Sequence, residues 1–96
     1  MTPTEKQNLV IRKLLLKQCV KANTVPKDVV AGWFSESAEG IEDTIDTMVA
    51  DSDIPVTTYG PQQEVRLIGV ISAVEYLDSN GGEVPPSLEK YRNSPR

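Results

Sequence analysis

The side chains of this sequence that could do chemistry are one cysteine, Cys19, and 14 carboxylates, because the chain contains no histidine. Without an imidazole, the chain cannot build a Ser-His-Asp triad, a Cys-His pair, a HExxH zinc site or a C2H2 zinc finger. One cysteine also excludes an internal disulfide and a multi-cysteine zinc site. No P-loop, GxGxxG fingerprint or EF-hand loop organises the carboxylates. We therefore expect no enzyme, no cofactor and no metal, and we predict a domain that binds a partner.

The charges are unevenly distributed along the chain, although its net charge is only −4. Residues 1–30 contain six basic and two acidic side chains, whereas residues 31–53 contain seven acidic side chains and no basic one. The 96 residues suffice for one domain with a modest core, and 39% apolar with 25% charged residues is a globular composition. The sequence therefore predicts one folded domain with a basic part and an acidic part.

Hydrophobic spacing predicts a long first helix that begins after Thr2 or Thr4 and runs to about Ala22. Its apolar residues cover a wide arc, so this helix should touch several neighbours. Cys19 falls on the apolar side, which predicts a buried structural thiol. The opposite side carries a basic stripe formed by Lys6, Lys13, Lys17 and Lys21.

Two shorter helices are predicted to follow. The first runs from Pro26 to about Ser35. Of the adjacent Trp33 and Phe34, one can enter the core and the other must point elsewhere. The second begins at a Ser37 cap and has the apolar spacing of an amphipathic helix. Its opposite side is polar and consists of Glu39, Glu42, Asp43, Asp46 and Thr47.

The second half of the chain is predicted to form a two-stranded β-hairpin and a last helix. Residues 54–59 and 64–68 read as the two strands, joined by a turn at residues 60–63. The last helix begins at Gly69 and stops at residues 80–82, Asn-Gly-Gly. Residues 83–96 contain three prolines and few apolar side chains. We therefore expect a domain over residues 1–82 and a flexible tail over residues 83–96.

This order of three helices, a hairpin and a closing helix resembles a winged-helix domain of the helix-turn-helix superfamily. The likeness is carried by residues 25–30 as the second helix, residues 40–49 as the third, and the junction at residues 49–54. Asp53 stands where glycine is usual in many members. The resemblance implies a mainly helical α+β fold: a three-helix core, a two-stranded β-hairpin wing and a C-terminal helix.

Winged-helix proteins most often insert the third helix into the major groove of duplex DNA and lay the wing along a phosphate strand. In this chain the phosphates on both groove walls would repel the acidic third helix, and the hairpin tip lacks lysine and arginine. We therefore predict a regulator of a transcription or replication assembly that acts mainly through protein contacts. The residues expected to make them are Glu39, Glu42, Asp43, Asp46, Trp33 and Tyr59. A simpler explanation is that the helix dipole favours negative charge in the first turns of this helix, and that the remaining carboxylates keep the domain soluble.

The alternative function is a dimeric DNA-binding transcription regulator. Its phosphate contacts would come from Lys6, Lys13, Lys17, Lys21 and Arg66. The four lysine contacts would give a salt slope of about −0.9 × 4, which allows weak non-specific binding without sequence reading. In a simpler interpretation, the lysine stripe is a solvated face of the helix. Exposed aromatic side chains could also support a homodimer.

The sequence also favours a soluble protein. Its N-terminal residues lack the basic-then-apolar order of a signal peptide. The uninterrupted apolar run at residues 14–16 is far too short to span a bilayer. We therefore expect a cytoplasmic protein that makes no membrane contact.

Overall fold

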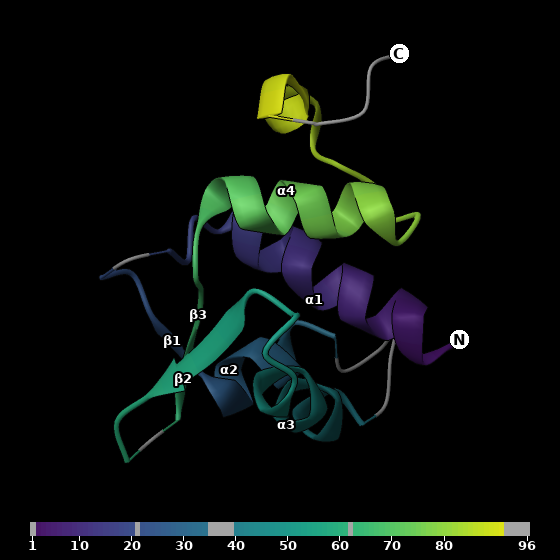
Figure 1. Ribbon diagram of the computed structural model, residues 1–96. Helices are drawn as coiled ribbons and strands as arrows, with labels where there is room; N and C mark the ends of the chain where they lie inside the picture. Colours follow the sequence, from purple (N-terminus) through teal and green to yellow (C-terminus); the bar gives the residue numbers. More distant parts are fainter. Residues whose placement is uncertain (1, 21, 35–39, 62, 92–96) are drawn as a thin grey trace.

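The computed structural model describes residues 2–20, 22–34, 40–61 and 63–91 of the chain. Within these residues it contains four α-helices, one 3-10 helix and a three-stranded antiparallel sheet (Figure 1). The predicted α+β class is confirmed. The helices and the sheet enclose one apolar core, to which every α-helix and the two longer strands contribute buried residues.

The first helix, α1 (Pro3–Leu16), begins at the predicted cap but ends earlier than predicted. The Thr2 hydroxyl accepts a hydrogen bond from the backbone N–H of Glu5 at 3.1 Å. At the other end Gln18 has a φ of 57°, in the left-handed region, so the helix cannot continue. The predicted end at about Ala22 is therefore wrong.

The residues after α1 leave the helix because they join the sheet. The Cys19 carbonyl accepts a hydrogen bond from the backbone N–H of Leu67 at 2.8 Å, and Val20 forms an isolated β-bridge with Leu67. Cys19 is still only 2% exposed. The predicted burial of this thiol is confirmed, but its place on a helix is wrong.

A short strand, β1 (Val25–Pro26), precedes the second helix, α2 (Lys27–Gly32). Val25 pairs with Val65 and Pro26 pairs with Glu64, both antiparallel. The predicted two-stranded hairpin is therefore one part of a three-stranded sheet. The prediction placed Pro26 inside the helix, but its φ of −55° and ψ of 143° are extended, and an edge strand tolerates a residue without an N–H. The predicted helix end at Ser35 lies outside the described residues.

The third helix, α3 (Ile41–Ala50), follows the predicted apolar spacing and buries Ile41, Ile45 and Met48. Its N-cap is Gly40, whose φ of 73° favours glycine. The predicted cap, Ser37, lies outside the described residues.

Strands β2 (Val56–Tyr59) and β3 (Glu64–Leu67) form the predicted hairpin, and the sheet order is β1-β3-β2. The central strand β3 directs Val65 and Leu67 into the core, where both are fully buried. Helix α4 (Val70–Ser79) follows directly and buries Ala73, Val74 and Leu77. The hairpin and α4 lie close to their predicted positions.

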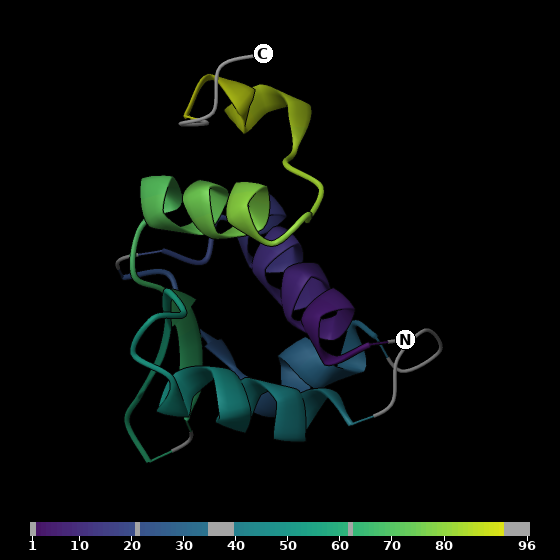
Figure 2. The same ribbon diagram turned by 45° about the vertical axis from the view of Figure 1, so that its right-hand side comes forward.

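The chain after α4 packs back onto the helices over residues 83–91, within the tail that the sequence predicts to be flexible. Val84 is 8% exposed and Pro85 is fully buried. The 3-10 helix η1 (Pro86–Tyr91) then lies along α4, on the side facing away from α3 (Figures 1 and 2). Two side chains of α1 hold the turn before it: Asn8 Nδ2 donates to the Asn80 carbonyl at 3.1 Å, and Arg12 lies 3.6 Å from Glu83.

The helices form a layered arrangement in which α1 lies between α4 and the α2–α3 pair. Figures 1 and 2 show η1 at one end of the molecule and α3 at the other, with the sheet closing one side. The core residues of α1 with no exposed area are Val10, Ile11 and Leu14. This packing leaves α3 and η1 as opposite outer surfaces.

Candidate interaction surfaces

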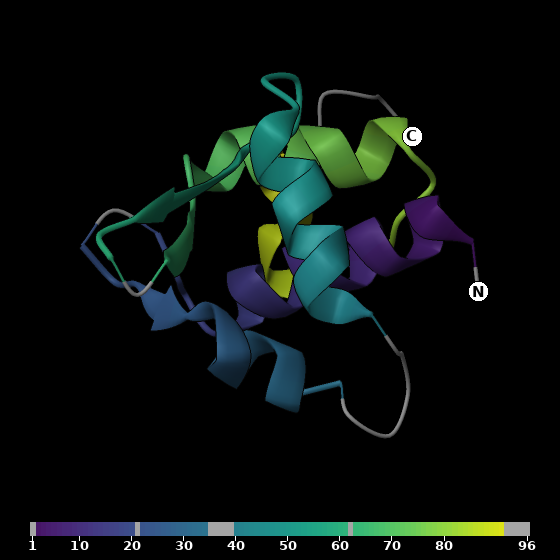
Figure 3. The ribbon, with the colours of Figure 1, turned by 90° about the horizontal axis from the view of Figure 1, so that it is seen from below.

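The outer side of α3 forms an acidic face made of Glu42, Asp43 and Asp46. All three carboxylates are exposed, and α3 contains no lysine or arginine. Figure 3 looks onto this helix, which lies in front of α1 and α4 in that view. Glu42 and Asp43 occupy the first turn, where the helix dipole favours negative charge. Glu39, which the sequence places on the same surface, lies outside the described residues.

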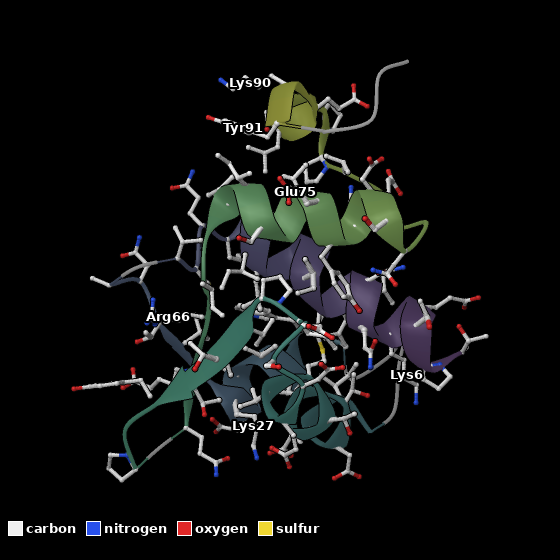
Figure 4. The ribbon with its side chains drawn as sticks, in the orientation of Figure 1. Lys6, Lys27, Arg66, Glu75, Lys90 and Tyr91 are labelled. Carbon is white, nitrogen blue, oxygen red and sulfur yellow. The ribbon has the colours of Figure 1, made fainter. Side chains whose placement is uncertain are left out.

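Asp46 is paired with a lysine of the neighbouring helix. Lys27 Nζ lies 2.9 Å from Asp46 Oδ1, and the Lys27 side chain is only 17% exposed. The pair joins the start of α2, where Figure 4 labels Lys27, to the middle of α3. Among the described residues, Glu42 and Asp43 have no such cation partner, so they supply most of the unbalanced charge of the acidic face.

The basic stripe of α1 does not form a continuous exposed row. Lys17 Nζ lies 5.6 Å from the centre of the Trp33 ring, a cation–π contact with the end of α2. Lys6 Nζ lies 3.9 Å from the position that a Cβ would take on Gly40, directly before α3. Lys13 is half-buried, and Lys21 lies outside the described residues. Two of the lysines therefore lie against the ends of the segment that joins α2 to α3.

Arg66 lies apart from these lysines, on the outer face of the sheet. Figure 4 shows Arg66 and Lys6 on opposite sides of the molecule. Arg66 lines a recess of about 460 Å³ together with Tyr59, which is 71% exposed, and Glu64. Glu64 Oε1 accepts a hydrogen bond from the Thr24 hydroxyl at 2.9 Å. The cations predicted to contact nucleic acid are thus not gathered on one surface.

The two aromatic residues that follow α2 have different environments. Phe34 is 6% exposed and belongs to the core, whereas Trp33 is half-buried and packs against the outside of the core. The sequence left open which of these two side chains enters the core, and the structure shows that it is Phe34. Trp33 contacts Lys17, so its ring is partly covered by its own chain.

Cys19 has the properties of a structural thiol. Burial raises the pKa of the Cys19 thiol above its ordinary value, and the nearby Lys17 lowers the pKa by less. The thiol is therefore protonated at neutral pH, and the thiolate is the reactive form. Among the described residues, no group of three or more histidine, cysteine, aspartate or glutamate side chains could hold a metal ion.

Sequence reasoning missed a surface made of apolar side chains, which we call the apolar face: Leu16, Val20, Val70, Ile71, Leu88 and Tyr91. Leu16 is 47% exposed and Ile71 is 54% exposed. The sequence offered a signal for it, because Leu16 and Val20 share one side of a helical projection. The prediction assigned that side to the core, since it could not show that the chain turns back after Leu16.

Comparison with known proteins gives no identification: no protein-family model matches this chain, and no curated protein or solved structure matches it. Over the described residues, the helices are too short and too polar for any of them to cross a bilayer. Any assignment of function must therefore come from the surfaces of the molecule.

Proposed function

We propose that this chain is a winged-helix binding module that regulates a transcription or replication assembly through protein contacts, with the acidic face of α3 as the main contact surface. The observation that carries this proposal is the exposure of Glu42 and Asp43 without a cation partner among the described residues. A partner with a basic surface would neutralise both carboxylates, and opposite charges would speed its association.

The arrangement of the elements supports the winged-helix part of the proposal. Helices α1, α2 and α3 are followed by the β2–β3 hairpin and then by α4, in the order that the resemblance implies. Strand β1 ties the hairpin to the helices by pairing with β3. Fold resemblance alone does not assign a function, so the argument for protein contacts depends on charge.

Electrostatics disfavours the insertion of α3 into a DNA groove. Duplex DNA carries one negative charge per about 1.7 Å of its axis. A carboxylate about 7 Å from one phosphate is destabilised by roughly 0.6 kcal/mol even in water, and each carboxylate in a groove would face several phosphates. Of the described carboxylates of α3, only Asp46 forms an ion pair, with Lys27.

The alternative is a dimeric DNA-binding regulator that uses Lys6, Lys13, Lys17, Lys21 and Arg66. The observation in its favour is that Lys17, the C-cap of α1, is exposed. The placement of Arg66 and Lys6 on opposite sides weakens it, because one straight duplex cannot contact both through the same face. Binding through α1 alone would be weak and independent of sequence.

Fluorescence anisotropy with two labelled probes separates these functions: a random DNA duplex and a lysine-rich peptide. We expect the peptide to bind at low salt with a steep salt dependence, and the duplex not to bind. Glu42→Lys should weaken peptide binding by about fivefold or more, because it reverses a charge on the acidic face.

The matched control is Glu89→Lys, which makes the same change on an exposed residue of η1, at the other end of the molecule. It should weaken peptide binding far less than Glu42→Lys. Micromolar binding of the duplex by the unmodified chain would instead support the DNA-binding alternative. Equal effects of the two substitutions would remove α3 as the contact surface.

A further inference from the structure

The apolar face lies where the end of α1, the start of α4 and the end of η1 meet. It borders two neighbouring recesses. The first, of about 400 Å³, is lined by Leu16, Val20, Val70, Leu88 and Tyr91, with other residues. The second, of about 310 Å³, shares Val70 and Tyr91 and adds Ile71. Because the two recesses share these residues, the apolar face is continuous.

The apolar face carries no formal charge on the residues that line its recesses. Apart from apolar side chains and glycine, they are neutral: Gln18, Asn23, Ser72 and Ser87. Other recesses of similar size do contain charged side chains, such as Asp53 and Glu75 in one and Glu64 and Arg66 in another. Lys90 Nζ does lie 5.3 Å from the centre of the Tyr91 ring, whereas the residues that line the recesses are themselves neutral, which points to a largely apolar partner surface.

We propose that the apolar face is the contact surface of a homodimer, in which a second copy of this chain presents the same face. A two-fold dimer requires a self-complementary surface, and a neutral apolar face is self-complementary in charge. This inference does not rest on the proposed function, because it uses a different surface from α3.

The distribution of charge over the molecule fits this pairing. The net charge of −4 makes two copies repel each other, and a contact through the acidic face would bring Glu42 and Asp43 of one copy close to those of the other. Figures 1 and 2 show α3, which carries the acidic face, at the opposite end of the molecule from η1. Pairing through the apolar face therefore places the two acidic faces at the outer ends of the dimer and leaves both accessible.

The shape of the apolar face suits a second copy. Leu16 and Ile71 project as half-exposed side chains, while the adjoining recess of about 400 Å³ gives room for an apolar side chain of the other copy. Projections and recesses on one surface allow the mutual insertion that anchors interfaces.

Sedimentation equilibrium of the full chain over about 10–500 µM tests the dimer. We expect a monomer–dimer equilibrium, and we expect Ile71→Glu or Leu16→Glu to raise its dissociation constant at least about tenfold. Both positions are about half exposed, so circular dichroism should show that the variants remain folded. A chain that stays monomeric at every concentration would overturn the proposal.

The matched control is Val29→Glu, which places the same charge on another exposed apolar residue, 43% exposed on α2. It should leave the dissociation constant within about twofold of the unmodified chain, as should Glu42→Lys on the acidic face. Equal weakening by Val29→Glu and Ile71→Glu would contradict the apolar face as the interface. Because Glu42→Lys tests the acidic face alone, the two proposals can fail separately.

The orientation of the two copies can be measured with spin labels. Cys19 is 2% exposed, so a label reacts with a cysteine introduced at the surface. In the proposed dimer, labels on Ile71→Cys should be closer together than labels on Val29→Cys, since α2 lies far from the apolar face (Figure 1). The reverse order of distances would show a dimer formed through another surface.

Discussion

At the scale of single residues, Gly82 shows how the absence of a side chain fixes the path of the chain. A Cβ on Gly82 would lie 2.7 Å from Leu77 Cδ2 and 2.9 Å from Asn8 Cγ. With any other residue at this position, the side chain of Leu77 or Asn8 would have to shift for the turn after α4 to approach α1 as it does. The sequence predicts the helix stop at residues 80–82, but it does not predict this close contact with α1.

We expect Gly82→Ala to lower the free energy of unfolding by about 1–3 kcal/mol, because the added methyl group must displace Leu77 or Asn8. Gly32→Ala is the matched control, since a Cβ at that helical position would meet no atom within 4 Å beyond its chain neighbours and its own helix backbone. It should raise the free energy of unfolding by about 0.5–1 kcal/mol. Urea denaturation followed by Trp33 fluorescence measures both, and a stabilising Gly82→Ala would contradict this packing.

Cys19 shows why burial is easier to predict than conformation. Free cysteine is among the residue types most often buried, so its side chain is expected in the core whether the backbone is helical or extended. The backbone, in contrast, follows the bond that the Cys19 carbonyl accepts from Leu67, which is far away in the sequence. Local spacing gives no information about that bond.

At the scale of elements, the sequence predicts α3, α4 and the β2–β3 hairpin well, and it fails at the junctions. The successful elements have strong local signals: apolar residues at helical spacing, or two short strands around a turn. Strand β1 has only two residues and depends on pairing with β3. Such a short strand is set by the partner strand, because two residues give no periodicity to detect.

The Lys27–Asp46 pair is predicted to fasten α2 to α3. A double-mutant cycle with Lys27→Met and Asp46→Asn should give a coupling energy of about 0.5–1 kcal/mol, near the upper limit for exposed pairs because Lys27 is mostly buried. Urea denaturation of the four proteins measures this energy. The same cycle with Glu42→Gln in place of Asp46→Asn should give a coupling near zero. A coupling near zero for Lys27 with Asp46 would show that the pair does not stabilise the helix contact.

At the scale of the whole molecule, the segment from Glu83 to Tyr91 belongs to the folded unit. Its buried Val84 and Pro85 close the side of the core next to α1 and α4. The sequence predicts a flexible tail here, because three prolines and few apolar residues are typical of one. Two buried residues are too few to be detected by composition, yet they are enough to order a short segment.

Truncation measures the contribution of this segment to the whole fold. We expect a chain of residues 1–82 to be less stable than a chain of residues 1–91 by about 2–4 kcal/mol, because it exposes the apolar surface that Val84 and Pro85 cover. The longer truncation is the control, since it keeps every described residue of the tail. Equal unfolding free energies for the two chains would show that the segment adds no stability.

The sequence by itself determined the α+β class, the main helices, the buried thiol and the two oppositely charged regions, because each depends on residue type and local spacing. The tertiary structure decided which of these charged side chains are paired within the chain and which stay exposed to a partner. It pairs Lys27 with Asp46, places Lys17 on Trp33, and leaves Glu42 and Asp43 exposed. It also creates the apolar face, where α1, α4 and η1 meet. Long-range packing sets these contacts, and no local pattern in the chain encodes the distance between residues that meet only after folding.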